Sequence, residues 1–147
     1  MKKFLIGLGI FFLVLVVAFA AFMAFGMLKA NKLSPSVEAF VQDFYDHYNN
    51  RDFTTIYTAL SHDKLRQFAA QDKFLTFMNG TFQKLGKVTG RQKGAWRINF
   101  ATDGLYFTVQ YKTTHEKAEA TDDFVLIQNK DSWLLVGYHI NSDALIA

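Results

Sequence analysis

The segment LYFTVQYKT, residues 105–113, decides the fold class of this chain. Phe107, Val109 and Tyr111 alternate with polar Thr, Gln and Lys residues, so every second side chain is apolar. Successive side chains on a strand point to opposite faces, and antiparallel sheets commonly keep one face in water. The segment therefore predicts a strand in an antiparallel sheet with one buried face.

Three other segments share this β-branched and aromatic composition, namely residues 93–101, 116–128 and 132–140. Asp103-Gly104 has the chemistry of a hairpin turn, and residues 129–131 form a second polar turn. The pattern predicts an antiparallel sheet of four strands or more.

Helical periodicity precedes the strands. Ser34-Pro35 after a short linker (residues 31–36) predicts a helix start, and Asp52 predicts the cap of a second helix. A later helix is expected to break or kink at Asn79-Gly80 and to end at Gly86. Helices followed by strands indicate an α+β domain with the helices packed on one side of the sheet.

The N-terminus is of a different kind. Residues 4–28 carry no charge and are long enough to cross a hydrocarbon core of ~30 Å as a helix. Ala18-Phe19-Ala20 resembles a signal-peptide cleavage site, but the apolar run continues beyond it, which favours an uncleaved anchor. We therefore expect a transmembrane signal anchor in residues 1–30 and an α+β domain in residues 31–147.

Composition narrows the classes of function. The net charge of +3 depends on Lys2, Lys3, Lys29 and Lys32, which flank the apolar run. Without them the domain is close to neutral, so no nucleic-acid partner is expected. The chain has no Cys, which excludes thiolate nucleophiles and Cys-based zinc sites.

Four short stretches carry a family resemblance: YNNRDF, IYTALS, LGKV and WLLVGYHI. Together with the order of elements, they resemble the nuclear transport factor 2-like superfamily over residues 34–143. The nearest likeness is to small membrane-anchored bacterial domains of unknown function. The resemblance implies a cone formed by a curved sheet and helices, often with a pocket inside, and dimerisation through the sheet.

Two functions follow from the resemblance. One is a binding or assembly module without catalysis, and the other is an isomerase or dehydratase with tyrosines in the cone. Phenols can donate to a developing oxyanion. Asp122-Asp123 is interpreted as a strand start or bulge, so no general base and no catalytic residue is assigned. The pocket candidates are Tyr45, Tyr48, Tyr57 and Tyr138.

No cofactor or metal is expected. Asp43 and His47 share one helix face, but no third ligand accompanies them. His62 and His115 are predicted to be solvated.

A block without acidic residues lies between Asp72 and Asp103, and Gly86, Gly90 and Gly94 predict a flexible loop at its centre. Such a loop can contact anionic lipid headgroups or an acidic partner, or it can be an ordinary solvated loop. The basic binding candidates are Lys84, Lys87, Arg91, Lys93 and Arg97.

In the last strand Tyr138 and His139 are expected on opposite faces, since neighbours on a strand alternate. His139 then shares the outer face with Trp133, and these two are the candidates for a sheet interface with a second copy or a membrane-protein partner. The resulting hypothesis is a single-pass protein of the bacterial inner membrane, with its C-terminal binding domain in the periplasm.

Overall fold

A computed structural model describes the backbone of residues 2–147 and the side chains of residues 13–25 and 33–147. Within that part of the chain, no helix is long and apolar enough to cross a membrane. The expected anchor, residues 4–28, lies partly outside the described side chains.

The chain divides into two compact units, which meet between Pro35 and Ser36. Helix α1 (Lys2–Asn49) includes both sides of this boundary and contains Pro35. The expected linker at residues 31–36 and the helix start at Ser34-Pro35 are therefore wrong. Proline removes one helical hydrogen bond without necessarily ending the helix.

Three short helices follow α1. Helix α2 (Phe53–Thr58) is capped by Asp52, which accepts a hydrogen bond from the amide of Thr55, as predicted. Helix α3 (Asp63–Phe68) comes next, and α4 (Gln71–Leu85) then runs to Gly86. Of the two alternatives predicted at Asn79-Gly80, a break is wrong, because α4 continues through both residues, and a kink stays a prediction.

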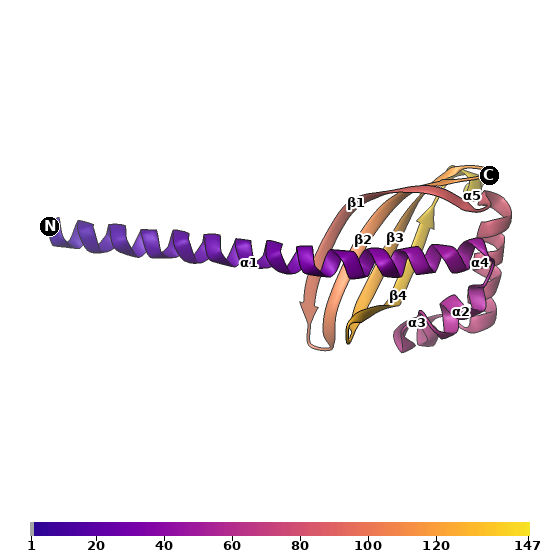
Figure 1. Cartoon of the computed structure of the whole chain (residues 1–147), viewed down its shortest axis with the longest axis horizontal. Helices are drawn as coiled ribbons and strands as arrows, with labels where there is room; N and C mark the ends of the chain where they lie inside the picture. The colour runs from indigo at the N-terminus through magenta and orange to yellow at the C-terminus, as the bar shows by residue number, and fades with distance from the viewer. Residues whose placement is uncertain (1) are drawn as a thin grey trace. The chain divides into compact units, whose positions relative to one another are not determined.

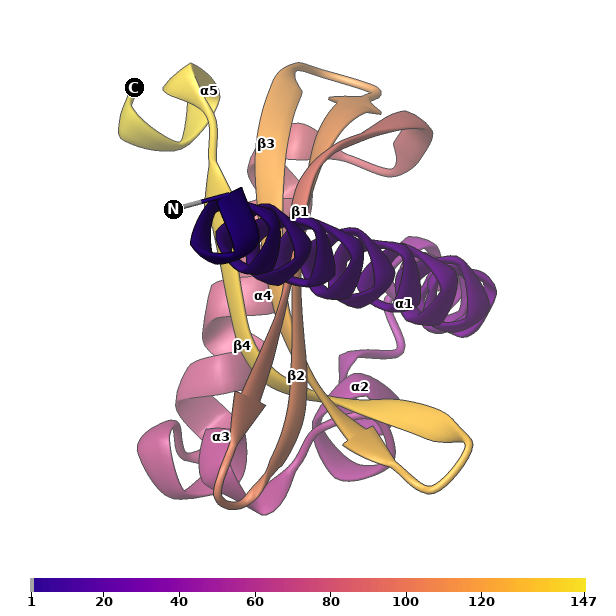
Figure 2. The same cartoon turned by 90° about the vertical axis from the view of Figure 1, so that its left-hand side faces the viewer.

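The strands are β1 (Val88–Ala101), β2 (Gly104–His115), β3 (Glu119–Asn129) and β4 (Ser132–Asn141). They form one antiparallel sheet in the order β1-β2-β3-β4, as Figure 1 shows. A short helix, α5 (Asp143–Ile146), ends the chain and is seen beyond β4 in Figure 2. The α+β class and the four-stranded sheet are thus confirmed. The loop predicted around Gly90 and Gly94 is wrong, since both residues lie within β1.

One face of the sheet packs on the residues of α1 that follow Ser36. The ring of Phe44 lies 5.0 Å from the rings of both Phe124 and Tyr138. On β2, Phe107 and Tyr111 are buried and their sequence neighbours are not, so the predicted alternation is confirmed. This aromatic layer forms the core of the domain.

A β-bulge in β4 reverses which of its side chains point to the core. Leu135 pairs with Leu126 and Gly137 pairs with Val125, so Val136 is an extra residue in the ladder. An extra residue reverses the alternation of side chains beyond it. Trp133, before the bulge, and Tyr138, after it, therefore share the inner face. The prediction that they lie on opposite faces is wrong.

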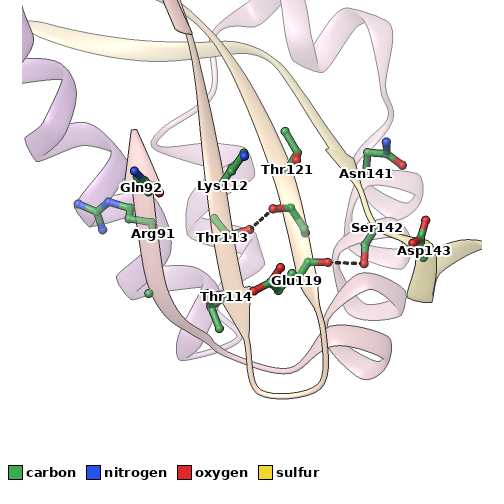
Figure 3. Close-up of a pocket in the computed structure, with 12 residues that line it drawn as sticks. Arg91, Gln92, Lys112, Thr113, Thr114, Glu119, Thr121, Asn141, Ser142 and Asp143 are labelled. Carbon is green, nitrogen blue, oxygen red and sulfur yellow. Dashed lines mark hydrogen bonds between the residues drawn. The ribbon is translucent and has the colours of Figure 1, made fainter. Parts of the chain in front are cut away.

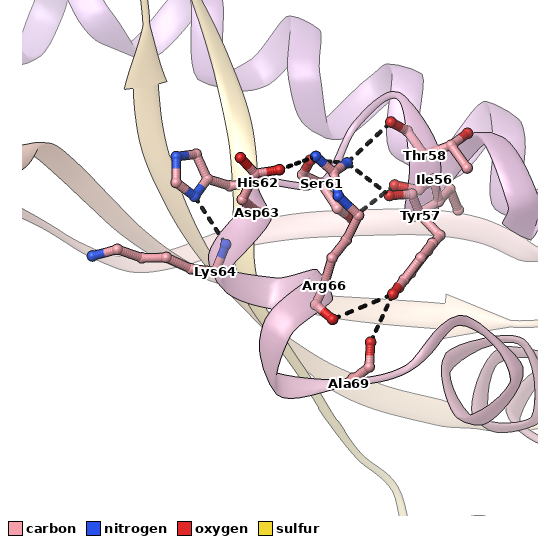
Figure 4. A network of polar contacts seen from close by, with 9 residues as sticks. All are labelled: Ile56, Tyr57, Thr58, Ser61, His62, Asp63, Lys64, Arg66 and Ala69. Carbon is pink, nitrogen blue, oxygen red and sulfur yellow. Dashed lines mark hydrogen bonds and ion pairs between the residues drawn. The ribbon is translucent and has the colours of Figure 1, made fainter.

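Arg66 fixes α2 against α3, as Figure 4 shows. Its guanidinium donates to the carbonyl of Ser61 at 2.8 Å and to that of Thr58 at 3.1 Å. Tyr57 completes the junction, because its hydroxyl donates to the carbonyl of Ala69 at 2.8 Å. These bonds satisfy carbonyls at the helix ends, which otherwise lack partners.

Candidate functional site

Asp122 is the centre of a buried polar cluster beneath the helices. Its Oδ2 accepts hydrogen bonds from the hydroxyls of Tyr45 (2.7 Å) and Tyr138 (2.9 Å), and its Oδ1 accepts one from Thr113 (2.9 Å). The residue is 0% exposed. Hydrogen bonds to a buried carboxyl are worth more than those in water, and losing them leaves costly unpaired groups.

His115 extends the cluster along β2. One ring nitrogen lies 3.2 Å from the hydroxyl of Thr113, and the other lies 3.2 Å from the carbonyl of Gly86. The same carbonyl accepts a hydrogen bond from Tyr48 at 3.3 Å. His115 is buried, so the prediction that it is solvated is wrong.

Burial is the largest influence on the pKa values of Asp122, Tyr45 and Tyr138. It raises the pKa of Asp122 above its ordinary value, although the hydrogen bond from Tyr45 and those from Thr113 and Tyr138 act in the opposite direction. Burial first, and then the nearby Asp122, also raise the pKa of Tyr45 and of Tyr138. Burial therefore favours the protonated form of Asp122, and it outweighs the three donated hydrogen bonds, which favour the carboxylate.

The successive acids Asp122 and Asp123 lie in the middle of β3 and point to opposite faces. The interpretation of the pair as a strand start or bulge is therefore wrong. Asp123 is on the outer face, where it accepts a hydrogen bond from Gln110 at 2.9 Å and lies 3.7 Å from His139. Only Asp122 belongs to the interior.

The structure brings two of the four tyrosine candidates together. Tyr45 and Tyr138 meet at Asp122, whereas Tyr48 binds the Gly86 carbonyl and Tyr57 binds the junction of α2 and α3. Among the described residues, no buried side-chain nitrogen or oxygen lacks a hydrogen-bond partner. The four phenols therefore do not line one common site.

Most of the basic candidates already have partners. Arg91 donates to Gln42 at 2.9 Å, and Lys93 lies 3.3 Å from the carboxylate of Glu38. The ammonium of Lys84 donates to the carbonyl of Leu145 at 3.0 Å. Lys87, which immediately precedes β1, and Arg97, in the second half of β1, are exposed. The five residues are spread from α4 through the connection at Lys87 into β1, rather than gathered in one loop.

The two sheet-interface candidates separate. Trp133 is buried on the inner face and donates from its indole nitrogen to the hydroxyl of Ser36 at 2.8 Å. His139 is exposed on the outer face. A shared outer patch of these two residues is therefore wrong, because the bulge at Val136 lies between them.

The Asp43–His47 pair lies at the junction of α1 and α2. Asp43 lies 3.4 Å from one ring nitrogen of His47, and Asp52 lies 3.0 Å from the other. Asp52 also caps α2 through the amide of Thr55. Its pKa is lowered mainly by a hydrogen bond from the side chain of Thr55, and the amide bond acts in the same direction. In the described part of the chain, no group of three or more His, Asp or Glu side chains is placed to hold a metal ion.

An apolar cavity of about 290 Å³, here called the groove, lies between α3, α4 and β4. Two of its phenylalanines are open to solvent: Phe68 at the end of α3 is 94% exposed, and Phe77 on α4 is 44% exposed. The ring of Phe77 lies 6.5 Å from that of Tyr138. The groove is lined by Leu65, Phe68, Ala69, Lys73, Phe74, Phe77, Val136, Gly137 and Tyr138.

A second, polar cavity of about 560 Å³ lies at the other end of β4, among the residues shown in Figure 3. Arg91 and Lys112 line it together with the acidic residues Glu119 and Asp143. Thr113 also lines it and donates inward to Asp122. Asp122 lines neither of the two cavities.

Comparisons with protein-family models, with curated proteins and with solved structures found no match. The candidate sites therefore stand on their own geometry. The sequence predicts neither of them, because the interpretation of Asp122-Asp123 as a strand start or bulge excludes Asp122, and Phe68 is one of several apolar residues in its segment. The available signal for Phe68 was its place in Phe68-Ala69-Ala70, an apolar end to a short helix.

Proposed function

We propose that this chain is a membrane-anchored, extracytoplasmic binding module without catalytic activity, and that the groove between α3, α4 and β4 is its binding surface. The observation that carries this proposal is the pair of solvent-exposed rings, Phe68 and Phe77, at an apolar cavity. Exposed aromatic surface around a concavity is unfavourable in water and is typical of binding sites.

The anchor is part of the same proposal. Its support is the uncharged run of residues 4–28, together with the more than half-exposed side chains of Leu13, Phe22 and Phe25 within it. A short N-terminus before such a run favours an N-in anchor, which exports the C-terminal domain. Together with the resemblance to cone-shaped nuclear transport factor 2-like domains, this supports a groove on the periplasmic side of a bacterial inner membrane.

A second candidate function, an isomerase-like enzyme, is favoured by one observation. Asp122 is a buried carboxyl beside the phenols of Tyr45 and Tyr138, the kinds of group that proton abstraction and oxyanion stabilisation use. A substrate would have to reach Asp122, yet both of its oxygens already accept hydrogen bonds and it is fully buried. The geometry therefore favours a stabilising role for the cluster.

The absence of cysteine provides a direct test of the groove. Gln67→Cys, next to Phe68, takes a single environment-sensitive fluorophore in the full chain in phospholipid nanodiscs. We expect 1-decanol to shift the emission of this label and to leave a label at Ile146→Cys unchanged, since Ile146 is exposed outside the groove. Phe77→Ser, and independently Phe68→Ser, should reduce the response.

Equal responses at the two labels, or a response that survives both serine variants, would overturn the proposed binding surface. The enzyme alternative has its own readout. We expect the chain not to accelerate deuterium exchange at the α-carbons of cyclohexanone in D₂O, measured by NMR. Acceleration that disappears in Asp122→Asn and in Tyr45→Phe would establish the enzyme instead.

A further inference from the structure

The groove offers a ligand almost no polar partner. The only polar groups on its side chains are the ammonium of Lys73 and the hydroxyl of Tyr138. That hydroxyl already donates to Asp122 at 2.9 Å. A molecule in the groove therefore meets aromatic and aliphatic carbon along most of its length.

This lining discriminates between two kinds of apolar ligand. A peptide has an amide and a carbonyl at every residue, and each costs about 1–3 kcal/mol if it is buried without a partner. Leu135 precedes the groove-lining residues of β4, and its amide and carbonyl are already bonded to Leu60 and His62. A hydrocarbon chain needs no such partners, so the groove favours an acyl chain over a peptide.

Charge supplies the second criterion. Lys73 is the only charged residue in the lining, and it is exposed on the first turns of α4. An ammonium at the edge of an apolar cavity is complementary to a ligand with one anionic end and an uncharged body. The long apolar stem of lysine can also cover the chain while its charge stays in water.

We propose that the groove binds a single-chain carboxylate of the fatty-acid class, with the acyl chain against Phe68, Phe74 and Phe77 and the carboxylate at Lys73. This inference rests on the proposed function, because it names the ligand class of the same groove. It assigns Lys73 as the residue that distinguishes a carboxylate from a neutral amphiphile.

The test compares two ligands that differ only at the head group. The Gln67→Cys chain, labelled and placed in nanodiscs, is titrated with decanoate and with 1-decanol at pH 8, below the concentration at which decanoate forms micelles. We expect Lys73→Gln to weaken the binding of decanoate, relative to that of decanol, roughly two- to five-fold, as for an exposed ion pair. Comparing the decanoate-to-decanol ratio between variants in identical discs cancels the different partition of the two ligands into lipid.

Lys87→Gln is the matched control, because Lys87 is an exposed lysine outside the groove. It should keep the wild-type ratio, while Lys73→Gln should lower it. A ratio unchanged by Lys73→Gln, or a stronger response to the peptide Leu-Leu-Leu than to decanoate, would overturn the inference and leave the binding surface intact. No response to either ten-carbon ligand would overturn the proposed function as well.

Discussion

Tyr138 belongs to two regions that differ in almost every physical respect. Its hydroxyl donates to Asp122 in the buried cluster, whereas its ring lines the groove with Phe77. The cluster is polar, closed and fully hydrogen-bonded. The groove is apolar and open, and Phe68 at its edge is almost entirely in water.

The difference shows which region is committed to the fold. A buried network with every polar atom paired gains nothing from a ligand, and removing any member leaves unpaired groups. An exposed apolar cavity differs, because covering it with a ligand removes apolar surface from water and is favourable. The polar residues of the cluster thus stabilise the fold, and the apolar residues of the groove form the proposed binding surface.

The largest effect that separates the two regions is expected from Asp122→Ala. The change removes the acceptor of Tyr45, Tyr138 and Thr113, and each buried hydroxyl left unpaired costs about 1–3 kcal/mol. We expect the free energy of unfolding to fall by about 2–5 kcal/mol, measured by urea unfolding followed through tryptophan fluorescence. A loss below about 0.5 kcal/mol, the usual range of surface changes, would contradict the structural role of the cluster.

The pH dependence of the free energy of unfolding is a second test of the structural role of Asp122. The folded state raises the pKa of Asp122 through burial, whereas in the unfolded chain it lies near 4. Its favourable contribution is therefore complete below about pH 4 and is lost as the pH rises through the folded-state value. We expect the stability advantage of the wild type over Asp122→Asn to shrink as the pH rises above about 4.

Urea unfolding of both proteins at several pH values provides the measurement. Asp123→Asn is the control, because Asp123 is the sequence neighbour on the outer face and its change should not give this trend. An advantage that grows with pH would mean that Asp122 is held as a carboxylate in the folded state.

The sheet could be predicted from local patterns because its signals are local. The alternation around Phe107 and Tyr111 and the Asp103-Gly104 turn act within a few residues. The bulge at Val136 could not be predicted in the same way. It depends on how β4 pairs with Leu126 and Val125, and this single extra residue moved Trp133 from the expected outer face to the core.

The candidate site shows the same limit. Tyr45 and Tyr138 were predictable as inward-facing phenols, but their common acceptor, Asp122, is distant in sequence from Tyr45. A doublet such as Asp122-Asp123 does not reveal which acid is inside until the register is known. The exposure of Phe68 depends on where α3 ends and on what α4 covers, which are properties of packing and not of pattern.

Tyr138→Phe tests the boundary between the two regions. The change removes one of three hydrogen bonds to Asp122 and keeps the ring that lines the groove. We expect a loss of about 1 kcal/mol in the free energy of unfolding, with the decanol response of the labelled Gln67→Cys chain unchanged. If the decanol response fell in proportion to stability, the cluster and the groove would be one functional unit rather than two.

The smallest effect on stability is expected from Phe68→Ser, the change at the most exposed ring of the groove. A side chain 94% exposed has little packing to lose, so the free energy of unfolding should stay within about 0.5 kcal/mol of the wild type. Phe74→Ser, in the buried wall of the same groove, is the matched contrast and should destabilise the chain strongly, since a buried aromatic is lost. Decanol binding that weakens in Phe68→Ser while stability stays constant would mean that this ring serves the ligand and not the fold. Conversely, a large loss of stability would mean that Phe68 packs against the domain in solution and is not an exposed part of the groove.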